Sequence, residues 1–348
     1  MGHGQRRAGR SGPASAHGRA VSGGGEFDYI KRRLAPLSSG FPGAADLSDD
    51  GAVITPSDGC ELAVTADTLV AGVHFPKDED PALTACRALR VNLSDLAAMG
   101  ARPLAYMLSI VWPEGAPDAL REGFADGLED SQKIFGIHLV GGDTTSAHGP
   151  WTIAVTAFGE LPAGRAVRRS GAKPGDLLVV TGAIGDAWLG LQGVMGARPA
   201  LGNAGHERLL RQRFNRPEPR VELAGALIEY AHAAIDISDG LIADCGHIAR
   251  ASGLDAGIEL ERLPLSDAGQ AWLALQSDEA AARQQLAGGG DDYELAIAVS
   301  PDNLAALTKA AGALPLTVIG RFEAGDAGVS VSWRGAPVRV DRPGFTHF

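Results

Sequence analysis

Two carboxylates lie inside an otherwise apolar stretch of the chain, "AIDISDGLIADCG" at residues 234–246. Asp236 and Asp239 are three positions apart, and isoleucine and leucine side chains flank them. Like charges about 4 Å apart repel each other by up to ~4 kcal/mol near a protein surface. Any fold that buries this stretch must therefore bring a compensating group to the two acids.

The pattern of apolar residues along the chain predicts an α/β fold, because segments typical of strands alternate with segments of helical periodicity. We expect strands at residues 61–70, 103–112, 151–161, 177–182, 293–299, 316–323 and 329–333, and helices at residues 81–101, 120–136, 220–234, 241–252 and 301–312. Residues 137–145 are predicted to form a short strand that ends in a Gly-Gly-Asp turn. The Gly-, Pro- and Arg-rich segment 196–219 is predicted to be a loop with little regular structure.

The length of 348 residues is enough for two domains of ordinary size. A Gly- and Pro-containing turn at residues 168–176 marks the expected border, which gives an N-terminal domain at 26–165 and a C-terminal domain at 166–348. Residues 1–25 are rich in Gly, Ser, Ala and Arg and contain no apolar stretch typical of a signal peptide, so we expect a disordered tail there.

The charge of the chain restricts its partners. The sequence holds 31 basic and 42 acidic residues, and four of the basic ones lie in the first 25 positions, so the rest carries 27 basic residues and a formal charge of −15. Such an acidic body is not expected to bind nucleic acid. There is no run of 18 apolar residues, so no membrane span is expected. Three cysteines without a CxxC pair fit a reduced, cytoplasmic setting.

Further acids lie next to small residues where predicted strands and helices end. Any single one is readily explained as a helix cap or a turn residue, but caps do not explain an Asp flanked by apolar residues on both sides. Oxygen ligands without a His or Cys cluster favour hard cations such as Mg²⁺, and such ions would offset the repulsion between Asp236 and Asp239. Since the chain lacks a Walker A motif, these residues alone predict only an acidic, metal-dependent phosphate enzyme.

A series of motifs, in order, resembles the thiamine-monophosphate kinase family, a branch of the aminoimidazole ribonucleotide synthetase-like superfamily. They are "GEFDYI", "DDGAVI", "VTADTLVAGVHF", "RVNLSDLAAMGARP", "GGDTT", "RSGAKPGD", "VTGAIGDA", "AIDISDGLIADCGHIARASG" and "GGGDDYEL", followed by a terminal "GFTHF". The resemblance covers about residues 25–348. It implies two α/β domains, with strands of the N-terminal domains forming a shared barrel in a homodimer. It also implies transfer of the γ-phosphate of ATP to thiamine monophosphate, giving thiamine diphosphate.

The resemblance also implies roles for individual residues. The positions that hold several Mg²⁺ ions match Asp50, Thr65, Ala66, Asp67, Asp95, Asp143, Asp236 and Asp239. The ATP-contacting positions match Gly142, Asp143, Arg169 and Ser238, and the positions that contact thiamine monophosphate match His74, Asp291 and Phe345.

The chain departs from the family pattern at three positions. Ala66 lacks the hydroxyl that is usual there, which matters only if the family ligand is the side chain rather than the backbone carbonyl. Ser48 replaces a common Gly, and Asp291 stands where Glu is usual, which shortens the reach toward the substrate. None of these changes removes a carboxylate from the expected metal ligands.

The expected mechanism is direct in-line phosphoryl transfer without a general base, because the acceptor phosphate oxygen is already anionic at neutral pH. The Asp residues are then ligands rather than bases. One alternative is an ATP-dependent cyclisation or amide activation, such as aminoimidazole ribonucleotide synthesis. Another is a non-catalytic protein that binds metal ions or thiamine phosphates.

Overall fold

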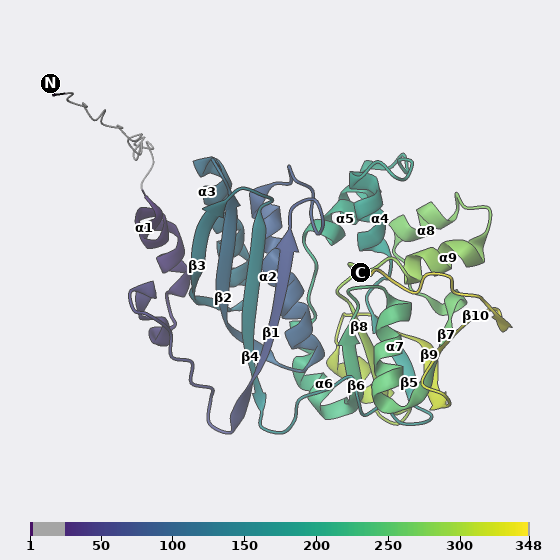
Figure 1. Cartoon of the computed structure of the whole chain (residues 1–348). Helices are drawn as coiled ribbons and strands as arrows, with labels where there is room; N and C mark the ends of the chain where they lie inside the picture. The colour runs from purple at the N-terminus through teal and green to yellow at the C-terminus, as the bar shows by residue number, and fades with distance from the viewer. Residues whose placement is uncertain (3–24, 347–348) are drawn as a thin grey trace.

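The structure is a computed structural model that describes residues 1–2 and 25–346, and the predicted disordered tail lies, apart from its ends, outside these residues. Two β-sheets stand side by side, one built from the N-terminal half and one from the C-terminal half (Figure 1). This arrangement confirms the predicted α/β class.

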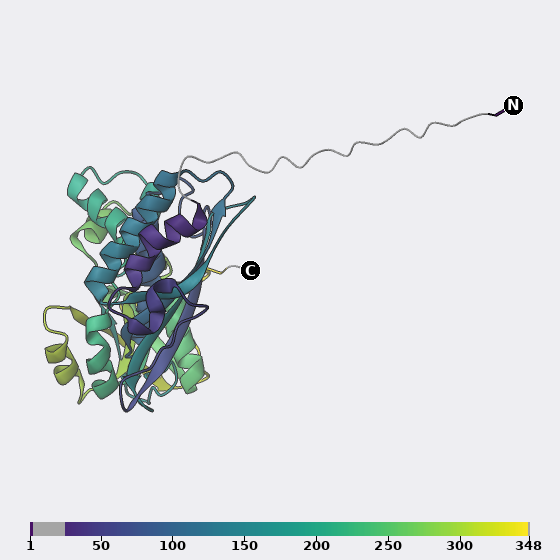
Figure 2. The ribbon, with the colours of Figure 1, turned by 90° about the vertical axis from the view of Figure 1, so that its left-hand side faces the viewer.

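The N-terminal sheet follows four short helical turns, α1 (Glu26–Tyr29), η1 (Ile30–Leu34), η2 (Ala35–Ser38) and η3 (Pro42–Leu47). Its elements are β1 (Cys60–Val70), α2 (Pro81–Ala98), β2 (Arg102–Pro113), α3 (Asp118–Phe135), β3 (His138–Ala147) and β4 (Thr152–Pro162). The strand order is β1-β4-β2-β3, with β3 parallel to β2 and the other pairs antiparallel. Figure 2 shows α2 and α3 together on one side of this sheet.

The C-terminal half begins with β5 (Leu177–Thr181) and forms a seven-stranded sheet in the order β11-β10-β7-β9-β5-β8-β6. Its other strands are β6 (Ala231–Asp236), β7 (Leu254–Glu259), β8 (Leu295–Val299), β9 (Leu316–Ala324), β10 (Val329–Trp333) and β11 (Ala336–Pro337). Its helices are α4 (Asp186–Val194), α5 (Ala204–Asn215), η4 (Val221–Leu223), α6 (Ala224–Tyr230), α7 (Leu241–Ser252), η5 (Leu260–Arg262), α8 (Asp267–Leu273), α9 (Glu279–Ala287) and α10 (Leu304–Ala310).

Helix α2 connects the two halves. It packs under β1 and β4 and also contacts β6, α5 and η4 of the C-terminal half. Its N-terminus is capped by Asp80, whose carboxylate accepts the N–H groups of Ala82 and Leu83, and most of its residues are buried. Because it is enclosed nearly all round, this helix carries polar side chains such as Arg87, Asn92 and Ser94 into the junction of the two halves.

Two predictions in the C-terminal half were wrong. Segment 196–219 is not a loop without regular structure, because it contains α5. The Asn203 side chain caps this helix by accepting the N–H groups of Gly205 and His206, and Leu210 and Phe214 are buried. The apolar face was not recognised in the sequence because arginines dominate the composition of the segment. The predicted helix at 220–234 ends at Tyr230, and the alanine-rich residues that follow form β6, since pairing with β8 outweighs their helical propensity.

The predicted Gly-Gly-Asp turn is also wrong, because β3 continues through Gly141 and Gly142 to Ala147. The register against β2 shifts beside these glycines, between Tyr106 and Met107. Gly142 has a φ of +152°, and a Cβ there would lie 1.8 Å from the carbonyl oxygen of Leu108. Glycine therefore permits a close strand approach here rather than a chain reversal.

The N-terminal sheet is open in this chain, with β1 and β3 at its edges. The part of the chain that the structure describes forms no closed barrel, so the predicted shared barrel is not a feature of the single chain. Within the described ranges, no helix is long and apolar enough to cross a membrane.

Candidate active site

A group of carboxylates from both halves meets where β1, α2 and β6 come together. Along β1, Thr65 and Asp67 are two positions apart and therefore lie on the same face of the strand, the face covered by α2. The Thr65 hydroxyl donates a hydrogen bond of 2.6 Å to Asp95 Oδ2 on α2. Asp236, the last residue of β6, is buried. We call Asp67, Asp95 and Asp236 the acid cluster.

The acid cluster is electrostatically unfavourable as it stands. Burial, reinforced by the charge of Asp95, raises the pKa of Asp67 to about 6. Burial also raises the pKa of Asp95, against the opposing effects of the Thr65 hydrogen bond, the charge of Arg169 and a hydrogen bond with Asp236. The pKa of Asp236 is raised well above its ordinary value by burial and then by the charges of Asp95 and Asp244. The three acids therefore lack sufficient compensation from the protein's own cations.

The turn after β6 is held by an acid that the sequence analysis did not identify. Asp244, in the first turn of α7, accepts the backbone N–H groups of Ser238, Asp239 and Gly240 with one oxygen, at 3.0, 3.1 and 3.1 Å. Burial, followed by the charge of Asp239, raises its pKa to about 7. Its position in a first helical turn was the available signal, since acids there commonly bind free N–H groups. The turn thus presents Ser238 and Asp239 in a fixed backbone arrangement.

The segment that contains Asp291 lies directly against this turn. Asp291 N–H donates to the Ser238 carbonyl and Tyr293 N–H to the Ile237 carbonyl, both at 2.8 Å. Asp291 and Tyr293 have φ angles of +67° and +50°, a conformation that costs on the order of 1–3 kcal/mol for a non-glycine residue. The Asp291 carboxylate forms an ion pair with Arg87 of α2. A strained backbone is therefore held in place beside the acid cluster by contacts from both halves.

Two other predicted substrate residues, Phe345 and His74, make contacts with the turn after β6 and with the end of β1. Phe345 N–H donates to the Asp239 carbonyl at 2.8 Å, so the C-terminal segment crosses the same turn, and the Phe345 side chain is exposed. His74 follows β1, and its Nδ1 accepts the Val70 N–H at 3.0 Å, which leaves Nε2 as the protonated nitrogen of a neutral ring.

Other predicted ligands are exposed rather than enclosed with the acid cluster. Ala66 alternates with Thr65 and Asp67 and is exposed, so its side chain points to the opposite face of the sheet. Asp143 pairs in register with the exposed Ser109, which places it on that face too. Asp50 and Gly142 are exposed as well. Arg169 is exposed, but its charge acts on Asp95. The roles of these residues remain predictions.

The donor set of the cluster fits a hard cation. Its ligand atoms are carboxylate and hydroxyl oxygens, and their charges are poorly compensated, which is the environment that Mg²⁺ favours. Over residues 1–2 and 25–346, however, no group of three or more His, Cys, Asp or Glu side chains is arranged to hold a metal ion. Mg²⁺ usually binds through one or two carboxylates together with substrate phosphates, so the cluster fits ions that bind together with a nucleotide.

Comparison with known proteins identifies the family of the chain. Residues 48–161 match the N-terminal domain of AIR synthase related proteins, and residues 173–332 match the C-terminal domain. A thiamine-monophosphate kinase from Caulobacter vibrioides is 46% identical over 324 residues, which cover 92% of this chain and 90% of that protein. This chain belongs to the thiamine-monophosphate kinase family. The family resemblance of its motifs is thereby confirmed.

Solved structures of thiamine-monophosphate kinases share the fold. The enzyme from Stenotrophomonas maltophilia is 41% identical, with a TM-score of 0.75 and coverage of 84% of this chain and 91% of that chain. A ThiL protein solved as a complex with AMPPCP and TMP is 31% identical, with a TM-score of 0.74 and coverage of 92% and 96%. The two-domain fold of AIR synthase related proteins is therefore shared along nearly the whole chain.

Proposed function

We propose that the protein phosphorylates thiamine monophosphate with ATP and forms thiamine diphosphate. The observation that carries this proposal is the acid cluster, which joins β1, α2 and β6 and lacks a compensating cation. A relative of 31% identity, matched over 92% of this chain, was solved with AMPPCP and TMP. A nucleotide and a phosphorylated acceptor bind cations through their phosphates, and such cations are what the cluster requires.

The site residues predicted from the sequence divide into three roles. Thr65, Asp67, Asp95, Asp236 and Asp239 are suited to hold Mg²⁺, with Asp50, Asp143 and the Ala66 carbonyl as further ligands. Arg169, Ser238 and Gly142, together with Asp143, are assigned to ATP, since an arginine suits a charge-assisted phosphate contact. His74, Asp291 and Phe345 are assigned to thiamine monophosphate. Several Mg²⁺ ions would neutralise the phosphates and align them for in-line transfer.

The protein's own groups position the reactants rather than move protons. The acceptor is a phosphate oxygen, which carries a negative charge at neutral pH, so its attack on the γ-phosphate requires no base. The fixed turn at Ser238 and Asp239 and the strained segment at Asp291 would hold the two substrates in line, which is where most of the rate enhancement of phosphoryl transfer arises.

We further propose a homodimer in which two N-terminal sheets form a shared barrel. The long helices α2 and α3 cover one face of the sheet (Figure 2), and the opposite face exposes Val64 and Met107. Large apolar side chains exposed on a sheet face are typical of an interaction surface. The expected domain division, 26–165 and 166–348, assigns one sheet to each domain. The use of ATP and the three free cysteines fit a cytoplasmic enzyme.

A coupled assay of thiamine diphosphate formed from thiamine monophosphate, ATP and Mg²⁺ tests the function. The enzyme is expected to use the monophosphate and to ignore free thiamine even at high concentration, because a hydroxyl acceptor would require a base. The rate is expected to fall at acid pH as the acceptor phosphate, with a second pKa near ~6, takes up a proton. Efficient phosphorylation of free thiamine, or no thiamine diphosphate at all, would refute the proposal.

A further inference from the structure

Arg87 of α2 occupies the point where three segments meet. One guanidinium nitrogen pairs with the Asp291 carboxylate, and another donates to the Phe214 carbonyl at the end of α5, at 2.6 Å. The guanidinium also lies over the Phe214 ring, with its carbon 4.4 Å from the ring centroid. The side chain is only 4% exposed. It therefore ties the N-terminal half to both the Asp291 segment and the C-terminal end of α5.

The ion pair engages one oxygen of Asp291 and leaves the other available. Arg87 contacts Oδ1, and no other hydrogen bond or ion pair to this carboxylate is found among the described residues. The Asp291 side chain is 23% exposed. Its partner is buried while the carboxylate itself remains accessible, an arrangement that orients an acid toward a ligand.

We propose that Arg87 is a positioning residue of the acceptor site, which holds the Asp291 carboxylate in the orientation that binds thiamine monophosphate. This inference rests on the proposed function, in which Asp291 contacts that substrate. Asp291 is one methylene group shorter than the family's usual Glu and reaches less far, so the placement of its carboxylate depends more on its backbone and on a fixed anchor. A guanidinium suits this task, because its rigid fork can bond the carboxylate and the Phe214 carbonyl at the same time.

The test compares Arg87→Met, Arg87→Lys, Asp291→Asn and the double variant Arg87→Met/Asp291→Asn in the full chain. Arg87→Met is expected to raise the KM for thiamine monophosphate by roughly tenfold, as after loss of a charge-assisted hydrogen bond. The KM for ATP and kcat should change by less than about threefold. Arg87→Lys should give an intermediate KM, because an ammonium can bond Asp291 but cannot reproduce the fork. In the Asp291→Asn background, Arg87→Met should have little further effect.

Arg283 provides a matched control. It is another buried arginine, bonded to Glu279 at 3.0 Å and to the Leu260 carbonyl at 3.2 Å, and it lies over the Trp333 ring at 5.6 Å. Arg283→Met should lower the melting temperature without a selective change in the KM for thiamine monophosphate. This variant therefore separates the loss of a buried arginine from the loss of Asp291 orientation.

The possible outcomes distinguish the two proposals. If the wild-type enzyme forms thiamine diphosphate but Arg87→Met behaves like Arg283→Met, or raises both KM values equally, the positioning role is wrong and the function stands. An unchanged KM in Asp291→Asn also overturns the positioning role. If the wild-type enzyme forms no thiamine diphosphate, the proposed function itself fails. A selective rise in the KM for thiamine monophosphate that depends on Asp291 supports the inference.

Discussion

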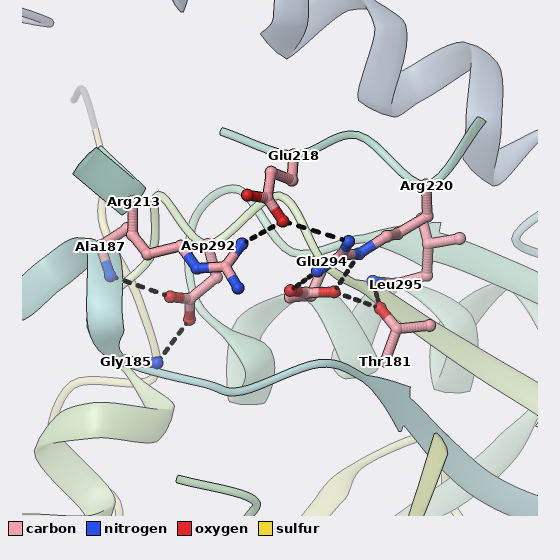
Figure 3. Close-up of polar contacts among 9 residues, drawn as sticks. All are labelled: Thr181, Gly185, Ala187, Arg213, Glu218, Arg220, Asp292, Glu294 and Leu295. Atoms are coloured by element: carbon pink, nitrogen blue, oxygen red, sulfur yellow. Dashed lines mark hydrogen bonds and ion pairs between the residues drawn. The ribbon is translucent and has the colours of Figure 1, made fainter. Parts of the chain in front are cut away.

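The acid cluster and Glu294 differ in how the negative charge of a buried acid is compensated. In the acid cluster, the neighbours of Asp67 and Asp236 that shift their pKa values are mainly other acids, and these pKa values are raised. Glu294, the residue before β8, is as buried as Asp236, but two nitrogens of Arg220 and the Thr181 hydroxyl bind its carboxylate (Figure 3). Glu294 is neutralised within the chain, whereas no arginine pairs with Asp67 or Asp236 among the described residues, and in the proposed function bound Mg²⁺ compensates them.

The charge of Asp292 is compensated in a third way, by backbone N–H groups. Its carboxylate accepts the N–H groups of Gly185 and Ala187 at 2.8 and 3.3 Å, at the N-terminus of α4 (Figure 3). Backbone dipoles stabilise a negative charge there, yet burial still raises the pKa of Asp292 well above its ordinary value. The backbone donors therefore compensate this buried acid only in part. Three acids within four positions thus have different partners: Asp291 pairs with Arg87, Asp292 binds a helix N-terminus and Glu294 pairs with Arg220.

The largest expected effect is on catalysis by the acid cluster. Asp95→Asn should lower kcat by on the order of 10³-fold or more, because it removes an oxygen charge that would hold the cations needed for phosphoryl transfer. The melting temperature of the apoprotein should stay equal or rise, since one repelling charge is lost. Thiamine diphosphate formation and thermal unfolding measure the two effects. Near-normal turnover in this variant would show that the cluster is structural.

Glu294, the acid paired with Arg220, is expected to affect the stability of the protein rather than catalysis. Glu294→Gln removes the carboxylate that binds two nitrogens of the buried Arg220 and leaves Arg220 only a 3.5 Å contact with Glu218. Breaking such a buried pair costs about 3–5 kcal/mol of unfolding free energy. Denaturant unfolding at pH 7 measures this loss. Glu129→Gln, which breaks an exposed pair with Lys133 on α3, is the control and should leave the midpoint unchanged within error. Equal midpoints for Glu294→Gln and the wild type would remove the contrast between the two groups.

A smaller effect is expected in the pH dependence of apoprotein stability. Asp67 has an ordinary pKa of 3.8 and a pKa of about 6 in the folded state, so the native protein binds this proton more tightly than the unfolded chain does. The resulting destabilisation is complete above about pH 6 and disappears as the pH falls toward 4. Asp67→Asn should therefore raise the melting temperature by a few degrees at pH 8, and the difference should shrink by pH 5. A difference that grows on acidification would contradict the assignment.

The smallest effect concerns Ala66, the position that lacks the family's usual hydroxyl. Its side chain points away from Asp67 and Asp95, on the opposite face of β1. A hydroxyl there does not reach the acid cluster, so Ala66→Ser should change kcat by less than about twofold. Steady-state kinetics at saturating substrates and Mg²⁺ measure this change. A gain of tenfold or more would show that the side chain at this position acts as a ligand.

The sequence predicted most of the fold wherever local pattern and tertiary context agree. Helix α7 at 241–252 and strand β10 at 329–333 have the predicted bounds. Strand β6 was predicted as part of a helix, because "AHAA" has helical propensity and only pairing with β8 makes it a strand. Helix α5 was missed because its apolar stripe is narrow and its arginines dominate the composition.

The site was predictable only where its residues lie in motifs. Asp95 and Asp236 occur in recognisable stretches, and the structure brings them together from different halves. Arg87 carries no motif, and its partner Asp291 is 204 positions away in the chain, so no local pattern could indicate the pair. The position of Asp143 on the opposite face of the sheet depends on the register of β3, which the sequence does not specify once a bulge is present.

The binding of Mn²⁺, as a paramagnetic substitute for Mg²⁺, tests the central claim most directly. Electron paramagnetic resonance of free Mn²⁺ measures how much ion the protein retains with a non-hydrolysable ATP analogue present. The wild-type protein should retain Mn²⁺ beyond what the nucleotide binds alone, and Asp236→Asn should lose at least one of these ions while Glu129→Gln keeps them all. Equal retention by the wild type and Asp236→Asn would show that the unpaired acids do not bind a cation.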